Sequence, residues 1–172
     1  GRSTAATCFA TSLVCPEDGC GVCEACRTAP LGGHADVELV STDGLSYRVE
    51  EARDLVMRSS MSPIKGPWHV IVVEDADRLT DQAVNVLLKS LEEPPPHALF
   101  VFATTDPHKL PQTILSRVQR YDFKLVPTAR LVEHLSYVLT QEGMAFEPAA
   151  LQLVAREGQG SVRDSLSLLD QV

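Results

Sequence analysis

The chain has 172 residues, with 15 lysines and arginines against 23 aspartates and glutamates, which gives a net charge of −8. Hydrophobic residues make up 44% of it and aromatic residues 5%, and no apolar run is long enough to span a membrane. This composition excludes a disordered tail, and also a protein that wraps nucleic acid with its bulk surface, because phosphate neutralisation needs clustered lysine and arginine. We expect one or two compact soluble domains, with any DNA contact local or shared with partner chains.

The chain begins at glycine, and its first segment, Arg2–Val14, predicts a helix. No positively charged leader with an apolar core is visible, so we expect no secretory signal and interpret the sequence as a piece of a longer protein. Gly1, Arg2, Ser3 and Thr4 match the end of a phosphate-binding loop, G-x4-G-K-[ST], with arginine where lysine is usual. A helix N-terminus presents free backbone N–H groups to phosphate, which makes these four residues candidate nucleotide ligands.

Four cysteines have the spacing C-x4-C-x2-C-x2-C, at Cys15, Cys20, Cys23 and Cys26. This spacing favours a metal centre over disulfides in a chain without a secretory leader, because cysteines three apart can direct their sulfurs to one tetrahedral ion. We predict a structural zinc knuckle at 15–26; the alternative is a redox C-x-x-C pair with two bystanders. Four thiolates leave no open coordination position, so the metal would stabilise structure and not catalyse. The fifth cysteine, Cys8, is expected in the core.

Strands and helices alternate in the middle of the chain. Strands are expected at Val37–Val40, Val70–Val73, Leu99–Ala103 and Tyr121–Leu125, and helices at Val49–Arg58, from Thr80 to the prolines at 94–96, and in short form before Ser116. The β-branched run at Val70–Val73 is typical of a strand buried on both faces of a parallel sheet. This order predicts an α/β domain with a mainly parallel sheet, whose ligands bind beyond the carboxyl ends of the strands.

From Pro127 the pattern is helical only. Apolar residues recur every three or four positions in Thr128–Gln141, Pro148–Arg156 and Ser161–Asp170. We therefore place a boundary near residue 126, between an α/β nucleotide-binding domain at 1–126 and a small domain of about three helices at 127–172.

Polar residues follow two of the expected buried strands. Glu74 and Asp75 come after one, and Thr104 and Thr105 after the next. A nucleotide-hydrolysing sheet needs a carboxylate at one strand tip to hold Mg²⁺ and a polar side chain on a neighbouring strand to reach the terminal phosphate. The pattern predicts such a site, although each residue taken alone is equally typical of a turn or a helix cap.

Five motifs, in chain order, resemble the AAA+ clamp-loader subunits of bacterial DNA polymerase III. They are the cysteine knuckle after the first helix, Leu87–Pro95, Ala103–Pro107, Leu110–Arg117 and Gly160–Gln171. The resemblance spans nearly the whole chain and implies an AAA+ P-loop-type parallel sheet with an inserted zinc knuckle, followed by a helical lid domain. The last motif is more similar to the gamma/tau type than to delta-prime.

The resemblance also implies roles for individual residues. Arg117 is similar to the family's arginine finger, which is offered in trans to ATP on a neighbouring subunit. Thr104 or Thr105 is similar to the first sensor, and Arg163 to the second sensor, in the lid. The alternative for Arg163 is a solvated charge at a helix end beside Asp164. Structural zinc, ATP and Mg²⁺ are the implied ligands.

Two departures from the family pattern predict a weak or inactive ATP site. Arg2 puts a planar guanidinium where a compact ammonium is usual. Glu74-Asp75 reverses the family's order of Asp then Glu, which displaces both carboxylates by about one methylene. We therefore leave the enzyme activity open.

The leading hypothesis is a gamma/tau-type subunit with a degenerate ATP site. It would join related subunits in a ring that loads the sliding clamp onto primed DNA, in the cytoplasm and without membrane contact. The alternatives are a delta-prime subunit acting as a non-hydrolysing stator and, more distantly, an unrelated zinc-stabilised nucleotide-binding module.

Overall fold

The computed structural model of the protein describes residues 1–171. Its contacts divide the chain into two units, Gly1–Tyr121 and Asp122–Val172. The division lies a few residues before the boundary expected near residue 126. The helices of the first unit are α1 (Arg2–Val14), α2 (Glu24–Thr28), α3 (Val49–Ser59), α4 (Asp81–Glu92) and α5 (Gln112–Leu115), with 3₁₀ turns η1 (Ala29–Leu31), η2 (Ala76–Arg78) and η3 (Pro107–Lys109). Its strands are β1 (Val37–Val40), β2 (His69–Val73) and β3 (Ala98–Phe102).

The three strands form a parallel sheet in the order β1-β2-β3. Every residue of the central strand, β2, is buried, as the β-branched run predicts. Successive side chains of a strand point to opposite faces. Ile71 and Val73 accordingly pack into one hydrophobic cluster, and Val70 and Val72 into another. The predicted α/β class with a parallel sheet is confirmed.

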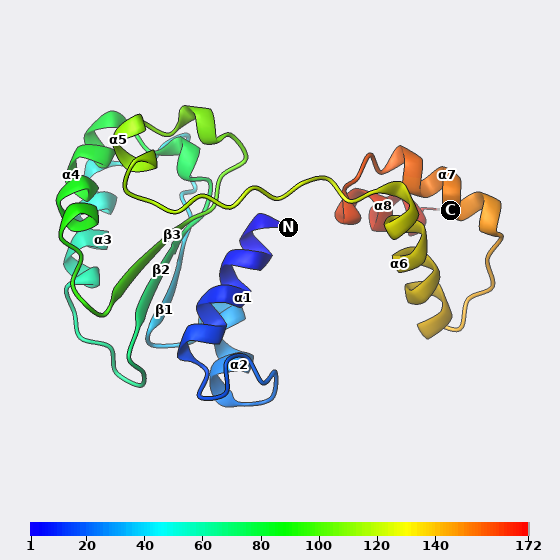
Figure 1. Ribbon diagram of the computed structural model, residues 1–172, viewed down its shortest axis with the longest axis horizontal. Helices are drawn as coiled ribbons and strands as arrows, with labels where there is room; N and C mark the ends of the chain where they lie inside the picture. The colour runs from blue at the N-terminus through cyan, green and yellow to red at the C-terminus, as the bar shows by residue number, and fades with distance from the viewer. Residues whose placement is uncertain (172) are drawn as a thin grey trace. The chain divides into compact units, whose positions relative to one another are not determined.

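Helices cover both faces of the sheet, with α1 and α2 on one side and α3, α4 and α5 on the other (Figure 1). Leu55 of α3, Leu87 of α4 and Ile114 of α5 are fully buried against the face that carries Ile71. The first unit is thus a three-layer structure, with the loops at the strand ends left accessible.

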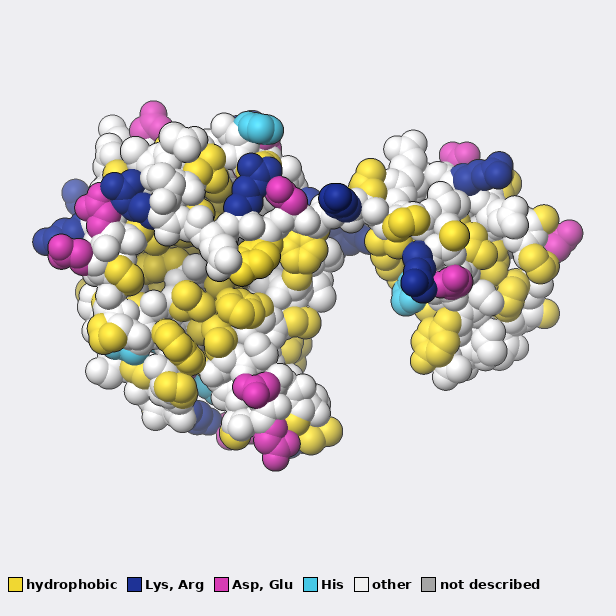
Figure 2. All heavy atoms as spheres, in the orientation of Figure 1, with side chains coloured by type: hydrophobic (Ala, Val, Ile, Leu, Met, Phe, Trp, Pro, Cys, Tyr) yellow, Lys and Arg dark blue, Asp and Glu magenta, His cyan; other side chains and the backbone are white. Residues whose placement is uncertain are grey.

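Charged groups are mixed on the face drawn in Figure 2, where Lys and Arg side chains lie singly among Asp and Glu. Hydrophobic side chains gather on the same face of the first unit (Figure 2), and those of Leu99–Phe102 in β3 are only partly buried. The face shows no broad basic surface, in keeping with the acidic composition.

Two expectations about the first unit and its end are wrong. The segment Tyr121–Leu125 is not a strand, because a strand needs a hydrogen-bonded neighbour and none pairs with it among residues 1–171. Its alternating apolar residues remain 71%, 65% and 74% exposed, at Tyr121, Phe123 and Leu125. Cys8 is exposed. Helix α1 buries Ala6 and Ala10, and at about 100° per residue a side chain two positions from each lies on the opposite side.

The second unit is a three-helix domain of α6 (Thr128–Gln141), α7 (Pro148–Glu157) and α8 (Val162–Leu169). Its core is formed by Leu131, Leu135, Leu139, Leu151, Val154 and Ala155. Helix α8 begins after Ser161, whose hydroxyl accepts a hydrogen bond from the Asp164 N–H at 3.2 Å. The three predicted helices are confirmed to within two residues. None of the helices described combines the length and apolarity needed to cross a bilayer.

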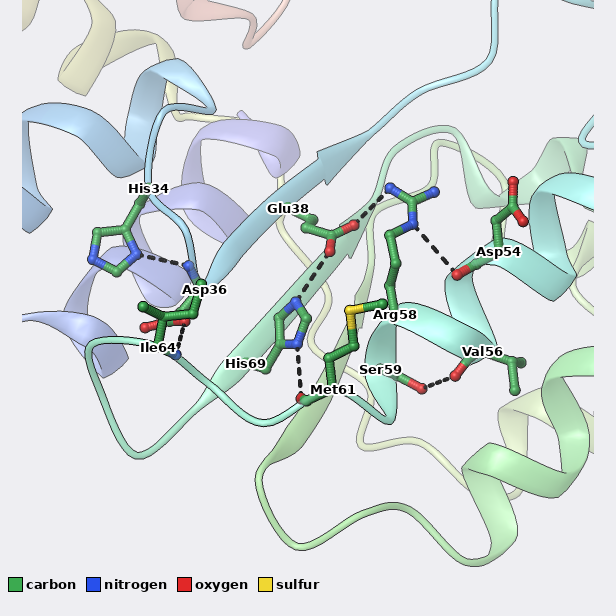
Figure 3. Close-up of polar contacts among 10 residues, drawn as sticks. All are labelled: His34, Asp36, Glu38, Asp54, Val56, Arg58, Ser59, Met61, Ile64 and His69. Atoms are coloured by element: carbon green, nitrogen blue, oxygen red, sulfur yellow. Dashed lines mark hydrogen bonds and ion pairs between the residues drawn. The ribbon is translucent and has the colours of Figure 1, made fainter.

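A polar network ties the loop between α3 and β2 to the amino ends of the strands (Figure 3). The carboxylate of Asp36, which is only 1% exposed, accepts hydrogen bonds from the backbone N–H groups of Ile64, Lys65 and Gly66. Next to it, Glu38 accepts from Arg58 at 2.8 Å and contacts the ring of the buried His69 at 3.1 Å. This end of the sheet is therefore fixed by hydrogen bonds, opposite the edge at which ligands are expected.

We expect Asp36→Ala to lower the free energy of unfolding by about 3 kcal/mol, because three backbone N–H groups lose the charged acceptor that a buried carboxylate provides. Burial alone would raise the pKa of Asp36, but the three N–H donors outweigh it and the pKa is lowered. The contribution is therefore complete above about pH 4 and is lost as the pH falls through the folded-state pKa. Denaturant unfolding from pH 7 to pH 3 measures it. Asp43 is exposed, so the control Asp43→Ala should change the free energy of unfolding little. If the loss of unfolding free energy caused by Asp36→Ala were as large at pH 3 as at pH 7, the proposed role of the carboxylate would be contradicted.

Candidate functional site

The four cysteines of the predicted knuckle lie together between α1 and α2. Their sulfur atoms are all within 4.8 Å of one another, and the sulfurs of Cys15 and Cys23 are 3.7 Å apart. Four thiolates at about 2.3 Å from a tetrahedral ion lie about 3.8 Å from each other, so this spacing fits one four-coordinate metal ion.

Backbone N–H groups of the knuckle point at the same sulfurs. Cys15 accepts hydrogen bonds from the N–H groups of Cys20 and Glu17, both at 3.4 Å, and these lower its pKa to about 6. Further N–H groups donate to the other three sulfurs. Gly19 and Gly21 have φ of +104° and +79°, which side-chain-bearing residues rarely adopt, so they supply the turns. These N–H groups favour the thiolate of Cys15, the form that binds metal. At Cys26 the Gly21 N–H also lowers the pKa, but burial and the three neighbouring sulfurs outweigh it and raise the pKa to about 12.

The strand tips bring the predicted acidic and hydroxyl residues to one edge, because β2 and β3 are parallel neighbours. The backbone at Glu74 is fixed by two hydrogen bonds, from its N–H to Val40 and from the Tyr47 hydroxyl to its carbonyl at 2.6 Å. Burial raises the pKa of Tyr47 to about 12, so the hydroxyl remains a donor. Asp75 has φ of +45°, is exposed and pairs with Arg78 at 3.3 Å.

One residue of this edge, Asp77, was missed by sequence reasoning. The hydroxyl of Thr104 donates to the Asp77 carboxylate at 2.6 Å and accepts from the Asp106 N–H at 3.0 Å. The hydrogen bond from Thr104 is the main reason that the pKa of Asp77 is lowered. Thr105 is exposed. Thr104 is thus the better-positioned of the two candidate sensors, and Asp77 is the carboxylate in contact with it.

The first turn of α1 holds the candidate phosphate ligands. Gly1 is the N-cap, no side chain within the described residues caps the helix, and Arg2, Ser3 and Thr4 are exposed. Ala6 and Ala10 pack the helix against the sheet. The free N–H groups of the first turn are therefore presented to solvent from a fixed helix, as an anion site requires.

Arg117 lies just after α5 and is held by its own chain. Its Nη1 donates to the Thr113 carbonyl at 2.7 Å and to the Ser116 hydroxyl at 3.2 Å, and its Nη2 donates to the Glu92 carboxylate at 2.5 Å. The side chain is still 32% exposed. Arg163 belongs to the second unit, where it is exposed in the first turn of α8.

This chain has the fold of an AAA+ type of protein: a parallel sheet with helices on both faces, followed in the sequence by a helical unit. It matches the RuvB Holliday junction branch migration motor of Thermotoga maritima with a TM-score of 0.62 and 16% identity, over 84% of this chain and 47% of that one. It also matches a DNA polymerase III gamma subunit-related protein of the same organism, with a TM-score of 0.55 and 28% identity, over 84% of this chain and 51% of that one.

Residues 1–127 match a family model described as DNA polymerase III, delta subunit, and residues 130–172 match the DNA polymerase III clamp loader subunit, ATPase lid domain. The chain belongs to this family of DNA polymerase III clamp-loader subunits. It is 41% identical to subunit tau of Escherichia coli and 37% identical to subunit gamma/tau of Mycobacterium tuberculosis, over 99% and 100% of its length. It spans 27% and 31% of those two relatives. The names of these relatives favour the gamma/tau type over delta-prime.

Proposed function

We propose that the chain is the nucleotide-binding and lid portion of a gamma/tau-type subunit, which works in a ring of related subunits to load the sliding clamp onto primed DNA in the cytoplasm. The observation that carries the proposal is the match to tau and gamma/tau subunits along almost the whole chain. The fold and the family of the lid support it.

The role of Arg117 in this proposal is to stabilise charge on ATP bound by a neighbouring subunit. A guanidinium suits that role because it is always charged and its N–H groups fork onto phosphate oxygens. Its exposed position after α5 and its anchored Nη1 edge support the assignment.

The chain's own nucleotide site would use the N–H groups of the first turn of α1, with Arg2, to bind ATP phosphates. Glu74 would hold Mg²⁺ through water, Thr104 would sense the terminal phosphate, and Arg163 would report it to the lid. Bound Mg²⁺ supplies charge neutralisation on the phosphates. Asp75 is already paired with Arg78, which supports a site that binds ATP weakly and hydrolyses it slowly.

The metal of the knuckle in this proposal is zinc, held by Cys15, Cys20, Cys23 and Cys26. Four sulfur donors in tetrahedral spacing are the donor set that zinc prefers in structural sites. The ion would fix the loop between α1 and α2 and take no part in chemistry.

Restoring the family residues tests the degenerate site. We expect the triple variant Arg2→Lys, Glu74→Asp, Asp75→Glu of the full-length protein to hydrolyse ATP roughly 10²-fold faster within the assembled complex than the unaltered chain, because misplacement by about 1 Å costs about that much in rate. Single-turnover hydrolysis and binding of a labelled ATP measure it. As a control, Asp43→Glu changes a residue outside the site and should leave both the hydrolysis rate and the binding of ATP unchanged. An unaltered protein that already turns over ATP as fast as the triple variant would contradict the degenerate site, and one that binds no ATP would favour the delta-prime alternative.

A further inference from the structure

The ion pair between Glu92 and Arg117 joins two elements that are far apart in the chain. Glu92 is the last residue of α4, and Arg117 follows α5. Both helices are fixed in the same hydrophobic cluster, through Leu87 of α4 and Ile114 of α5. The carboxylate and the guanidinium therefore meet on rigid supports, not on mobile loops.

Three acceptors set the orientation of the guanidinium. The Thr113 carbonyl and the Ser116 hydroxyl both accept hydrogen bonds from Nη1, and the Glu92 carboxylate accepts one from Nη2. The hydrogen bonds of Arg117 within the part of the chain that the structure describes run from Nη1 and Nη2, and none of them uses the Nε–H. Adjacent Nε–H and Nη2–H groups form a fork that matches two oxygens of one phosphate.

Stability does not account for the pair. Its two side chains are 32% and 50% exposed, and exposed ion pairs add little to folding because water screens them. An arginine side chain that is free in solution samples many rotamers, and all but one must be given up when it binds phosphate. A carboxylate that fixes Nη2 beforehand removes much of this cost.

We propose that Glu92 is the positioning residue of Arg117: it holds the guanidinium so that its Nε side faces outward, ready to bind a phosphate group. This inference rests on the proposed role of Arg117 as an arginine finger. Glu92 itself touches no phosphate and acts only through Arg117.

The test compares variants of the full-length protein in its assembled complex, with the steady-state rate of ATP hydrolysis as the readout. We expect Glu92→Ala to lower kcat roughly tenfold with little change in the KM for ATP, since the finger contacts are made mainly in the transition state. Glu92→Gln keeps an acceptor oxygen at the same place and should retain more than half of the activity that Glu92→Ala loses. The neighbouring Glu93→Ala removes an exposed carboxylate that does not contact Arg117 and should have no effect.

A double variant separates positioning from an independent role. If Glu92 acts through Arg117, adding Glu92→Ala to Arg117→Ala changes the rate no further. A further fall in the double variant, or full activity of Glu92→Ala beside an impaired Arg117→Ala, overturns the inference and leaves the finger intact. Full activity of Arg117→Ala itself overturns the finger assignment and the inference together.

Discussion

Replacing Cys23 by serine will release the metal of the knuckle and lower the Tm of the first unit by about 10 °C. A closed four-thiolate site contributes its binding free energy to folding, and the loss of one ligand removes several kcal/mol. Serine is an informative replacement because Cys23 is also the N-cap of α2, where its sulfur accepts from the Cys26 N–H. A serine hydroxyl fills the cap position, so the loss measured reports the metal.

The control for this experiment is Cys8→Ser, since Cys8 is exposed and lies outside the cluster. It should change neither the metal content nor the Tm. Elemental analysis of freshly purified protein should find one zinc per chain, and a chelator should reproduce the effect of Cys23→Ser. Protein that contains no metal and unfolds at the same temperature with or without chelator would contradict the zinc knuckle.

Arg117→Ala will lower ATP turnover by the assembled complex roughly 10³-fold, the effect expected when a finger that neutralises transition-state charge is removed. The chain's own nucleotide binding should not change, because the proposed finger acts on the neighbour's ATP. Folding should also be preserved, since the side chain is partly exposed and pairs with a half-exposed carboxylate. Presteady-state hydrolysis together with ATP titration separates these effects.

Arg130→Ala is a matched control, because Arg130 is likewise paired with a carboxylate, Glu133 at 3.0 Å, on an exposed helix face. Its removal should leave turnover unchanged. If Arg117→Ala and Arg130→Ala behaved alike, Arg117 would be an ordinary surface arginine and the assignment in trans would fail.

The elements that could be predicted from the sequence are those in which local pattern and burial agree. Val70–Val73 is an uninterrupted apolar run because it is the central strand, and Thr128–Gln141 repeats its leucines at helical spacing because one side packs in a core. Tyr121–Leu125 carries the alternation of a strand, but strand formation depends on a neighbour, which a sequence pattern does not contain. Cys8 was misplaced because the buried side of α1 is formed by Ala6, Ala10, Thr11 and Val14, and Cys8 lies away from it.

The candidate site was predictable in place but not in detail. The ends of the predicted strands indicate where polar residues gather, and the cysteine spacing alone indicates a group of metal-binding cysteines. The contact of Asp77 with Thr104 depends on the turn η2, and that of Glu92 with Arg117 on how two helices pack 25 residues apart. Glu92 stands in one of the motifs noted in the sequence, and Asp77 lies two residues after the predicted pair Glu74-Asp75. Nothing in the spacing of either acid distinguishes it from neighbouring exposed carboxylates.

Clamp loading onto DNA is the decisive assay for this subunit. The full-length protein is combined with the loader subunits with which it co-purifies, the sliding clamp, ATP and a primed circular DNA, and the clamp retained on DNA after gel filtration is measured. Retention of the clamp should require ATP and this subunit, and Arg117→Ala should strongly reduce it. A protein that remains a monomer without affinity for clamp or loader subunits, and leaves clamp retention unchanged, would contradict the proposed function.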